Sequence, residues 1–151
     1  IDLKTDVKSL MKLAYDQAIK SESKGEVPVG AIYLHDNQII AESGNVTISN
    51  HDPSGHAEIM VLRKASEIRK NHRIGGTLVV TLEPCVMCMG AMIQARIETL
   101  IFGAFDPRSG AAGSAFDLSD SPNLNHKINV IGGVMENECK DLIQGFFQSK
   151  R

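Results

Sequence analysis

The sequence lacks tryptophan, and only 5% of its 151 residues are aromatic. It contains no apolar run near the roughly 18 residues that a membrane span requires, and no basic, apolar leader of the secretory kind. Its net charge of −2 lacks the strong basic excess that is typical of general nucleic-acid-binding domains. We therefore expect a cytoplasmic protein without membrane attachment, in which any contact with nucleic acid comes from a local patch.

Cysteine is also scarce. The three cysteines cannot all pair with one another, and two of them, Cys85 and Cys88, lie only three positions apart. This pattern argues against a secreted disulfide framework and favours thiols kept reduced for a metal or for chemistry. The sequence shows no repeat and no linker, and its length suits one domain. We predict a single domain over residues 1–151.

Hydrophobic periodicity predicts an alternation of helices and strands. Helical periodicity occurs before Gly25, from 56 to about 70, over 86–95 and after 135. Strand-like runs occur at 31–34, 38–42, 78–82, 99–103 and 128–131. Asp36 and Asn37 indicate a hairpin turn between the first two strands. This order predicts an α/β fold of three α/β/α layers, with a central mixed five-stranded sheet and helices on both faces.

Three burial predictions follow from the same patterns. Ile68, with other apolar residues of helix 56–70, is expected to face inward. The helix over 86–95 is apolar nearly all round and is expected to lie deep in the core. Cys139 lies on the apolar stripe of the last helix and is expected to be a buried thiol without a chemical role.

The residues with chemical potential fall into two short elements, His56-Ala57-Glu58 and Pro84-Cys85-Val86-Met87-Cys88. Cys85 and Cys88 are spaced so that both sulfurs face the same side of a first helical turn, where the helix dipole favours the metal-binding thiolate. Together with His56 they form the three-ligand set of a catalytic zinc site, which keeps its fourth position open. Glu58 is expected to stand beside that open position without binding the metal.

Other interpretations remain for each element taken alone. A lone CxxC pair is also typical of redox proteins and of structural zinc sites. A structural site requires a fourth ligand, for which Cys139, His51, His72 and His126 are available, but none of them forms a second tight ligand pair. The combination H-x-E…P-C-x-x-C is the signature of zinc deaminases, so catalytic zinc is the favoured interpretation.

Deamination of an aromatic amine needs hydroxide at a ring carbon and a proton for the departing ammonia. Zinc lowers the pKa of a bound water to about 7, which supplies the nucleophile near neutral pH. Glu58 is placed to take the proton of this water, to deliver it to the ring nitrogen and to help protonate the leaving amine. We therefore expect Glu58 to be the catalytic residue.

Over nearly its whole length the sequence resembles the bacterial tRNA-specific adenosine deaminases of the cytidine-deaminase-like superfamily. The resemblance rests on residues 25–31, 45, 56–60, 81–88, 102–104, 110–114, 125–126 and 146–147. It implies a cytidine-deaminase-like fold with one Zn²⁺ per subunit, held by His56, Cys85 and Cys88. It further implies a homodimer that converts adenosine to inosine at the wobble position of a tRNA anticodon, in an arginine tRNA.

The resemblance also implies residues that contact the substrate. Asn45 matches the residue that hydrogen-bonds the purine, the Ala57 N–H lies where such enzymes hold the attacking oxygen, and Val29 belongs to the pocket wall. From the sequence alone, Asn45 after Gly44 is more often a turn residue, and Val29 is equally well a strand-core residue. We expect further contacts with the RNA loop from charged and aromatic residues near the later loops and the C-terminus, namely Asp106, Arg108, Lys127, Phe146, Lys150 and Arg151.

Two rival functions stay open. A deaminase of a free base or small nucleoside, of the guanine or cytosine type, would share the zinc site, Glu58 and the fold. It would be insensitive to salt, whereas RNA binding through phosphate contacts weakens steeply as salt rises. A structural zinc protein or a CxxC redox protein would have no deaminase turnover at all.

Overall fold

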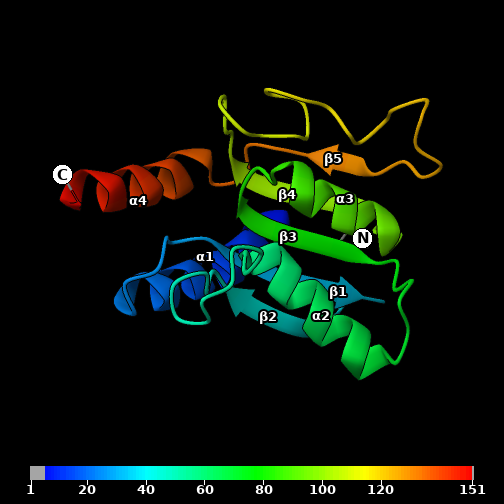
Figure 1. Cartoon of the computed structure of the whole chain (residues 1–151), viewed down its shortest axis with the longest axis horizontal. Coiled ribbons are helices and arrows are strands. Elements are labelled where there is room, and N and C mark those ends of the chain that lie inside the picture. Colours follow the sequence, from blue (N-terminus) through cyan, green and yellow to red (C-terminus); the bar gives the residue numbers. More distant parts are fainter. Residues whose placement is uncertain (1–5, 151) are drawn as a thin grey trace.

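Five strands form one mixed sheet in the computed structural model, which describes residues 6–150. The strands are β1 (Gly30–His35), β2 (Gln38–Gly44), β3 (Thr77–Leu82), β4 (Thr99–Ala104) and β5 (Asn129–Ile131), in the order β2-β1-β3-β4-β5 across the sheet (Figure 1). β1 is antiparallel to β2 and β3, whereas β3–β4 and β4–β5 are parallel pairs. The predicted mixed five-stranded sheet is therefore confirmed.

The turn between β1 and β2 has the predicted residues. Asp36 and Asn37 both have positive φ, 51° and 62°. Positive φ at both central positions is the hallmark of the two-residue hairpin turn whose twist matches that of the flanking strands. Asp and Asn tolerate this left-handed conformation better than other non-glycine residues, so the local sequence specifies the hairpin.

Four helices complete the three layers: α1 (Val7–Ser23), α2 (Ala57–Arg69), α3 (Val86–Gln94) and α4 (Glu136–Ser149). α1 and the start of α4 pack on one face of the sheet, and α2 and α3 on the other (Figure 1). Alternation along β1 divides the core accordingly, since Ile32 and Leu34 face α1 while Ala31 and Tyr33 face α2. Within residues 6–150, no helix is long and apolar enough to cross a bilayer.

Two glycines let α1 approach the sheet closely. Gly30 and Gly44 pair across β1 and β2. A Cβ atom on Gly30 would lie 2.1 Å from the Ala14 carbonyl oxygen, and one on Gly44 would lie 1.9 Å from the Ser21 hydroxyl. Side chains at these two positions would push α1 off the sheet and displace the end of β2, where the candidate site begins.

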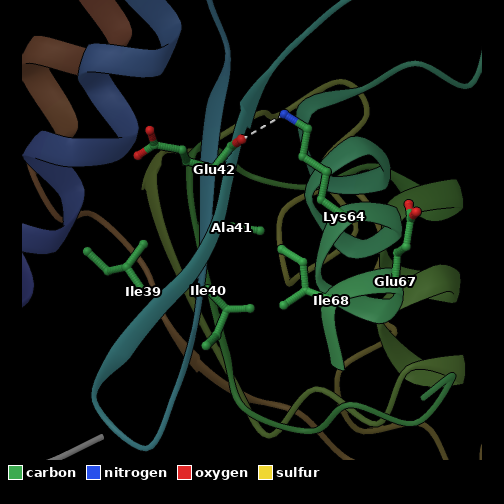
Figure 2. Close-up of a pocket in the computed structure, with 7 residues that line it drawn as sticks. All are labelled: Ile39, Ile40, Ala41, Glu42, Lys64, Glu67 and Ile68. Carbon is green, nitrogen blue, oxygen red and sulfur yellow. Dashed lines mark hydrogen bonds between the residues drawn. The ribbon is translucent and has the colours of Figure 1, made fainter. Parts of the chain in front are cut away.

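The inward orientation predicted for Ile68 is wrong, because this side chain is 61% exposed. The sheet ends at β2, so the last turn of α2 projects beside an edge strand and meets only part of it. Figure 2 shows the result, a surface hollow in which Ile68 faces Ile40 while Lys64 donates a hydrogen bond to the Glu42 carbonyl oxygen at 3.1 Å. The other three apolar residues predicted to face inward from α2 are buried, namely Val61, Leu62 and Ala65.

The prediction that α3 lies wholly in the core is correct for only one of its sides. Met89 and Met92 are fully buried, but Val86 is 48% and Met87 38% exposed. α3 belongs to an outer layer of the three, so only the side toward the sheet can be covered by this chain. An apolar strip of α3 consequently remains at the surface. Cys139, in contrast, is buried in the α1 layer of the core, as predicted.

Candidate functional site

Two helix N-termini converge on the same point. His56 is the N-cap of α2, Cys85 is the N-cap of α3, and Cys88 lies in the first turn of α3. Neither N-cap side chain makes a capping hydrogen bond. Ser, Thr, Asp or Asn at such positions stabilises a helix by about 1 kcal/mol, so His56 and Cys85 forgo this contribution. A departure from the usual helix-capping preferences is expected at residues that serve a function.

The donor atoms of these residues form a compact triangle. The Nδ1 atom of His56 lies 3.7 Å from the Sγ of Cys85 and 3.4 Å from the Sγ of Cys88. Tetrahedral zinc, with ligands at roughly 2.0–2.3 Å, requires donor atoms about 3.3–3.8 Å apart, so the group fits this ion. Within residues 6–150, no fourth His, Cys, Asp or Glu joins the group. The four fourth ligands considered for a structural site therefore lie elsewhere, namely Cys139, His51, His72 and His126.

The site favours one thiolate. The hydrogen bond with Cys88 lowers the pKa of Cys85 to about 4 against the opposing effect of burial, and His56 adds to this lowering. The same hydrogen bond, together with burial, raises the pKa of Cys88. The hydrogen bond to Cys85 raises the pKa of His56. A preformed thiolate beside a second thiol and an imidazole is the donor set that zinc prefers.

Glu58, the second residue of α2, lies beside this group and is 4% exposed. Burial raises the pKa of its carboxyl group to about 6. Its Oε1 atom is buried and has no hydrogen-bond partner in the described chain. Because a buried oxygen without a partner is destabilising, this arrangement indicates an atom that is placed to meet a substrate or a water molecule.

The raised pKa of Glu58 makes the stability of the zinc-free protein depend on pH. The folded chain binds this proton more tightly than the unfolded chain, because the pKa is about 6 rather than the ordinary 4.5. The ionised, buried carboxylate is therefore destabilising above pH 6, and this effect disappears as the pH falls below 4.5. We expect zinc-free Glu58→Gln to be more stable than the zinc-free parent by about 2 kcal/mol at pH 7, with no such gain near pH 4.

Urea unfolding of both zinc-free proteins across this pH range measures the difference. Glu67→Gln, at an exposed position of the same helix, is the control and should show little change. A gain for Glu58→Gln that stays constant with pH would contradict the assignment of the raised pKa to this group.

A cavity of about 330 Å³ opens over the group. Its lining includes His56, Glu58 and Cys85, and it also includes four of the residues expected to contact substrate, namely Val29, Asn45, Ala57 and Asp106. The structure thus brings these seven residues together from α2, α3 and the ends of β1, β2 and β4. The volume suits one nucleobase-sized ligand.

Asn45 is held rigidly at the rim of this cavity. Its backbone N–H donates to the Val29 carbonyl oxygen at 3.0 Å, and its own carbonyl oxygen accepts from the Ser21 hydroxyl at 3.2 Å. The side chain is buried, and its amide nitrogen makes only a long contact, 3.5 Å, to the Thr47 hydroxyl. The two bonds fix the backbone of Asn45, and its side-chain amide is left able both to donate to and to accept from a ligand.

The other described residues that were expected to contact RNA do not line the cavity. Arg108 is exposed, and its backbone N–H donates to the Asp106 carboxylate at 3.1 Å. Phe146 is buried on α4, with its ring edge-on to Phe147 and under the ammonium group of Lys150. α4 extends beyond the sheet in Figure 1.

Lys127 and Arg151 were also expected to contact RNA. Lys127 forms an ion pair with Asp120 at 3.1 Å. Arg151 lies outside the described residues. Lys127 is exposed and does not line the cavity, so any contact that it makes with RNA occurs at the surface.

Five other residues of the lining were not among those expected at the site: Val27, Thr47, Leu82, Glu83 and Ser109. Glu83 carried a usable signal, because a charged residue directly after an apolar strand and before Pro84-Cys85 is unusual. Its side chain is 2% exposed. Thr47 and Ser109 lie in loops whose residue types give no comparable indication.

The hollow between β2 and α2 is larger, at about 520 Å³ (Figure 2). It is lined by the isoleucines described above together with Glu42, Lys64 and Glu67, and no histidine or cysteine reaches it. With no metal ligands and no unpartnered buried carboxylate, it offers no chemistry comparable with that of the smaller cavity.

Comparison with known proteins points to one enzyme class. Residues 4–104 match the family model described as the cytidine and deoxycytidylate deaminase zinc-binding region. The tRNA-specific adenosine deaminase of Haemophilus influenzae is 44% identical over 144 residues, which cover 94% of this chain and 83% of that protein. A solved structure from work on tRNA:A34 deaminases, which edit adenosine to inosine at the wobble position, is 40% identical with a TM-score of 0.86. It covers 89% of this chain and 98% of its own.

Guanine deaminase from Nitrosomonas europaea shares the same fold. Its solved structure has a TM-score of 0.78 and covers 94% of this chain and 85% of its own, but only 21% of the residues are identical. At this level of identity the likeness extends to the fold alone. It does not discriminate between base and RNA substrates.

Proposed function

Because this chain belongs to the cytidine and deoxycytidylate deaminase family, we propose that it hydrolyses adenosine to inosine at the wobble position of a tRNA anticodon, releasing ammonia. The observation that carries this proposal is the buried carboxylate of Glu58, whose Oε1 atom has no hydrogen-bond partner in the described chain, beside the His56–Cys85–Cys88 group and in the lining of a nucleobase-sized cavity. The choice of tRNA over other substrates is supported by the 44% identical tRNA-specific relative.

His56, Cys85 and Cys88 hold one zinc ion per chain. The fit of their donor atoms to tetrahedral zinc and the low pKa of Cys85 support this assignment. When bound, zinc acidifies a water molecule so that it attacks the base near neutral pH. The three residues leave one side of the group open to the cavity, which is the side that Glu58 faces.

Glu58 carries the proton transfers. Its free oxygen accepts a proton from the attacking water and delivers this proton to the purine ring nitrogen. In a second transfer, Glu58 passes the other proton of the water to the departing amine. Water thus contributes the oxygen of inosine and the proton on its ring nitrogen, and the second proton of water leaves with the amine as ammonia. A carboxyl group with a pKa near 6 is suited to both accepting and donating a proton near neutral pH.

Two residues orient the base, and a third stabilises the attacking oxygen. Asn45 presents its side-chain amide to the polar edge of the purine, and Val29 provides an apolar wall. Ala57 is the first residue of α2, so its N–H has no partner within the helix and lies at the positive end of the helix dipole. This N–H stabilises the negative charge that develops on the attacking oxygen.

The RNA contacts and the assembly are further parts of this proposal. Asp106 lies at the cavity rim, and the surrounding RNA loop also contacts Arg108, Lys127, Phe146, Lys150 and Arg151. The substrate is an arginine tRNA. Two chains associate in the cytoplasm through the apolar strip of α3, where Val86 and Met87 are exposed.

Incubation of the zinc-loaded protein with an anticodon stem-loop that carries adenosine at the wobble position tests this function, with inosine followed by mass spectrometry. Free adenosine, guanine and cytosine are assayed in parallel. We expect inosine in the stem-loop alone, with a rate at low substrate that falls steeply as salt increases. Turnover of a free base with an untouched stem-loop would overturn the tRNA assignment and favour the small-base deaminase.

A further inference from the structure

Glu83 is a buried carboxylate that the mechanism does not use. It directly follows β3 and precedes Pro84 and the zinc-ligand candidate Cys85. Its side chain is 2% exposed. A carboxylate in such a position is unfavourable unless donors surround it, so its partners indicate why it is there.

All the donors to this carboxylate come from one segment, residues 106–114. The Oε1 atom accepts from the backbone N–H of Asp106 at 3.0 Å. The Oε2 atom accepts from the N–H groups of Ala112 at 3.0 Å and Ser114 at 3.1 Å. The Ser114 hydroxyl donates as well. Four donors from a segment 23 to 31 positions away therefore converge on a single side chain.

The segment is shaped around the carboxylate. A Cβ atom on Gly110 would lie 2.3 Å from the Cδ atom of Glu83, so only glycine allows the chain to pass so closely. The N–H of Ala111 donates to the Pro84 carbonyl oxygen at 2.7 Å, which fastens the same turn to the residue next to Glu83. Residues 105–128 contain no helix or strand, so these bonds take the place of regular structure in fixing the turn.

The segment carries one wall of the cavity, because Asp106 and Ser109 both line it. The hydrogen bonds of the described chain link this segment to Glu83 and Pro84 but not to Glu58 or to the ligand candidates His56, Cys85 and Cys88. Loss of the Glu83 contacts should therefore displace the wall while the proton-transfer residue and the metal ligands stay in place.

We propose that Glu83 is a positioning residue for substrate recognition, which holds residues 106–114 as a preformed rim for the RNA loop. This proposal rests on the proposed function for its substrate. A rim that is already ordered does not have to be ordered by the substrate, so it favours binding of the RNA more than it favours the chemical step.

Two variants separate this role from general support of the fold. Glu83→Gln keeps the shape but replaces one acceptor oxygen with an NH₂ group that faces N–H donors. Ser114→Ala removes one donor and leaves the carboxylate intact. Ser119→Ala is the matched control, since Ser119 lies farther along the same loop and its hydroxyl bonds Asp117 rather than Glu83.

Steady-state kinetics of the zinc-loaded full chain with the stem-loop provide the first measurement. For Glu83→Gln we expect KM to rise about tenfold or more with kcat nearly unchanged, as loss of charge-assisted hydrogen bonds at a binding rim predicts. Ser114→Ala should shift KM in the same direction by less, and Ser119→Ala should leave it unchanged. A fall in kcat together with zinc content at constant KM would overturn the proposal, as would unchanged kinetics in both variants.

Amide hydrogen exchange provides a measurement that does not depend on the substrate. We expect the amides of Asp106, Ala112 and Ser114 to exchange faster in Glu83→Gln, while those of α2 and α3 keep their protection. If Glu83→Gln fails to fold, Ser114→Ala decides the question by the same comparison. Unaltered exchange in the segment would overturn the positioning role, whereas failure of the parent protein to deaminate the stem-loop would overturn only the proposed function.

Discussion

Replacement of Glu58 by glutamine is expected to lower the rate of inosine formation by roughly 10²–10⁴-fold without loss of zinc. Glutamine has the same shape and fits beside His56 and Cys85, but its amide cannot accept the proton of the attacking water. Glu58 is also outside the donor group, so the metal keeps all its ligands. Single-turnover assays of the stem-loop give the rate, and elemental analysis of the same preparation gives the zinc content.

The outcome discriminates between two roles for this carboxylate. Loss of zinc in parallel with activity would show that Glu58 supports the metal rather than the proton transfers. Retained turnover in a zinc-loaded Glu58→Gln protein would contradict the catalytic role outright. Glu67→Gln, an exposed position on the same helix, should keep both zinc and activity.

Replacement of Cys88 by alanine is expected to abolish zinc binding and, with it, detectable turnover. Cys88 is fully buried, and its Sγ lies 3.4 Å from the Nδ1 of His56. Its removal leaves two ligands, and no other His, Cys, Asp or Glu in the described chain belongs to the group. Zinc content after dialysis and stem-loop turnover are the two measurements.

Cys139→Ala is a matched control for this experiment. Cys139 is also a buried thiol, but it packs with α1 and β4 on the opposite face of the sheet. The same change there should lower stability by about 1 kcal/mol and leave zinc and turnover intact. A Cys88→Ala protein that stays zinc-loaded and active would contradict the assigned ligand set.

The sequence was sufficient to predict features that depend on local patterns. Positive φ at Asp36 and Asn37 follows from the residues themselves, and the order of helices and strands follows from hydrophobic periodicity. The convergence of His56 with Cys85 and Cys88 was also expected, because motifs at helix starts gather at one edge of an α/β sheet. The first two predictions needed no knowledge of how distant segments pack, whereas the third assumed the general arrangement of an α/β sheet.

The errors and omissions concern features that depend on the finished architecture. Ile68 is apolar and has helical spacing, but its exposure follows from the position of β2 at the sheet edge. Met87 is exposed because α3 is an outer layer. The function of Glu83 depends on donors 23 to 31 positions later, in a segment without regular structure, so no local pattern could assign its partners.

The convergence of two helix starts has a consequence for the way metal and fold depend on each other. His56 and Cys85 are 29 residues apart, and in an unfolded chain their encounter closes a loop at an entropic cost of about 3–4 kcal/mol. The folded chain has already closed that loop, so it binds zinc more tightly than the unfolded chain by about 10²–10³-fold. By mass action the melting temperature then rises with the free zinc concentration, so the stability of the folded protein depends on how much zinc is available to it.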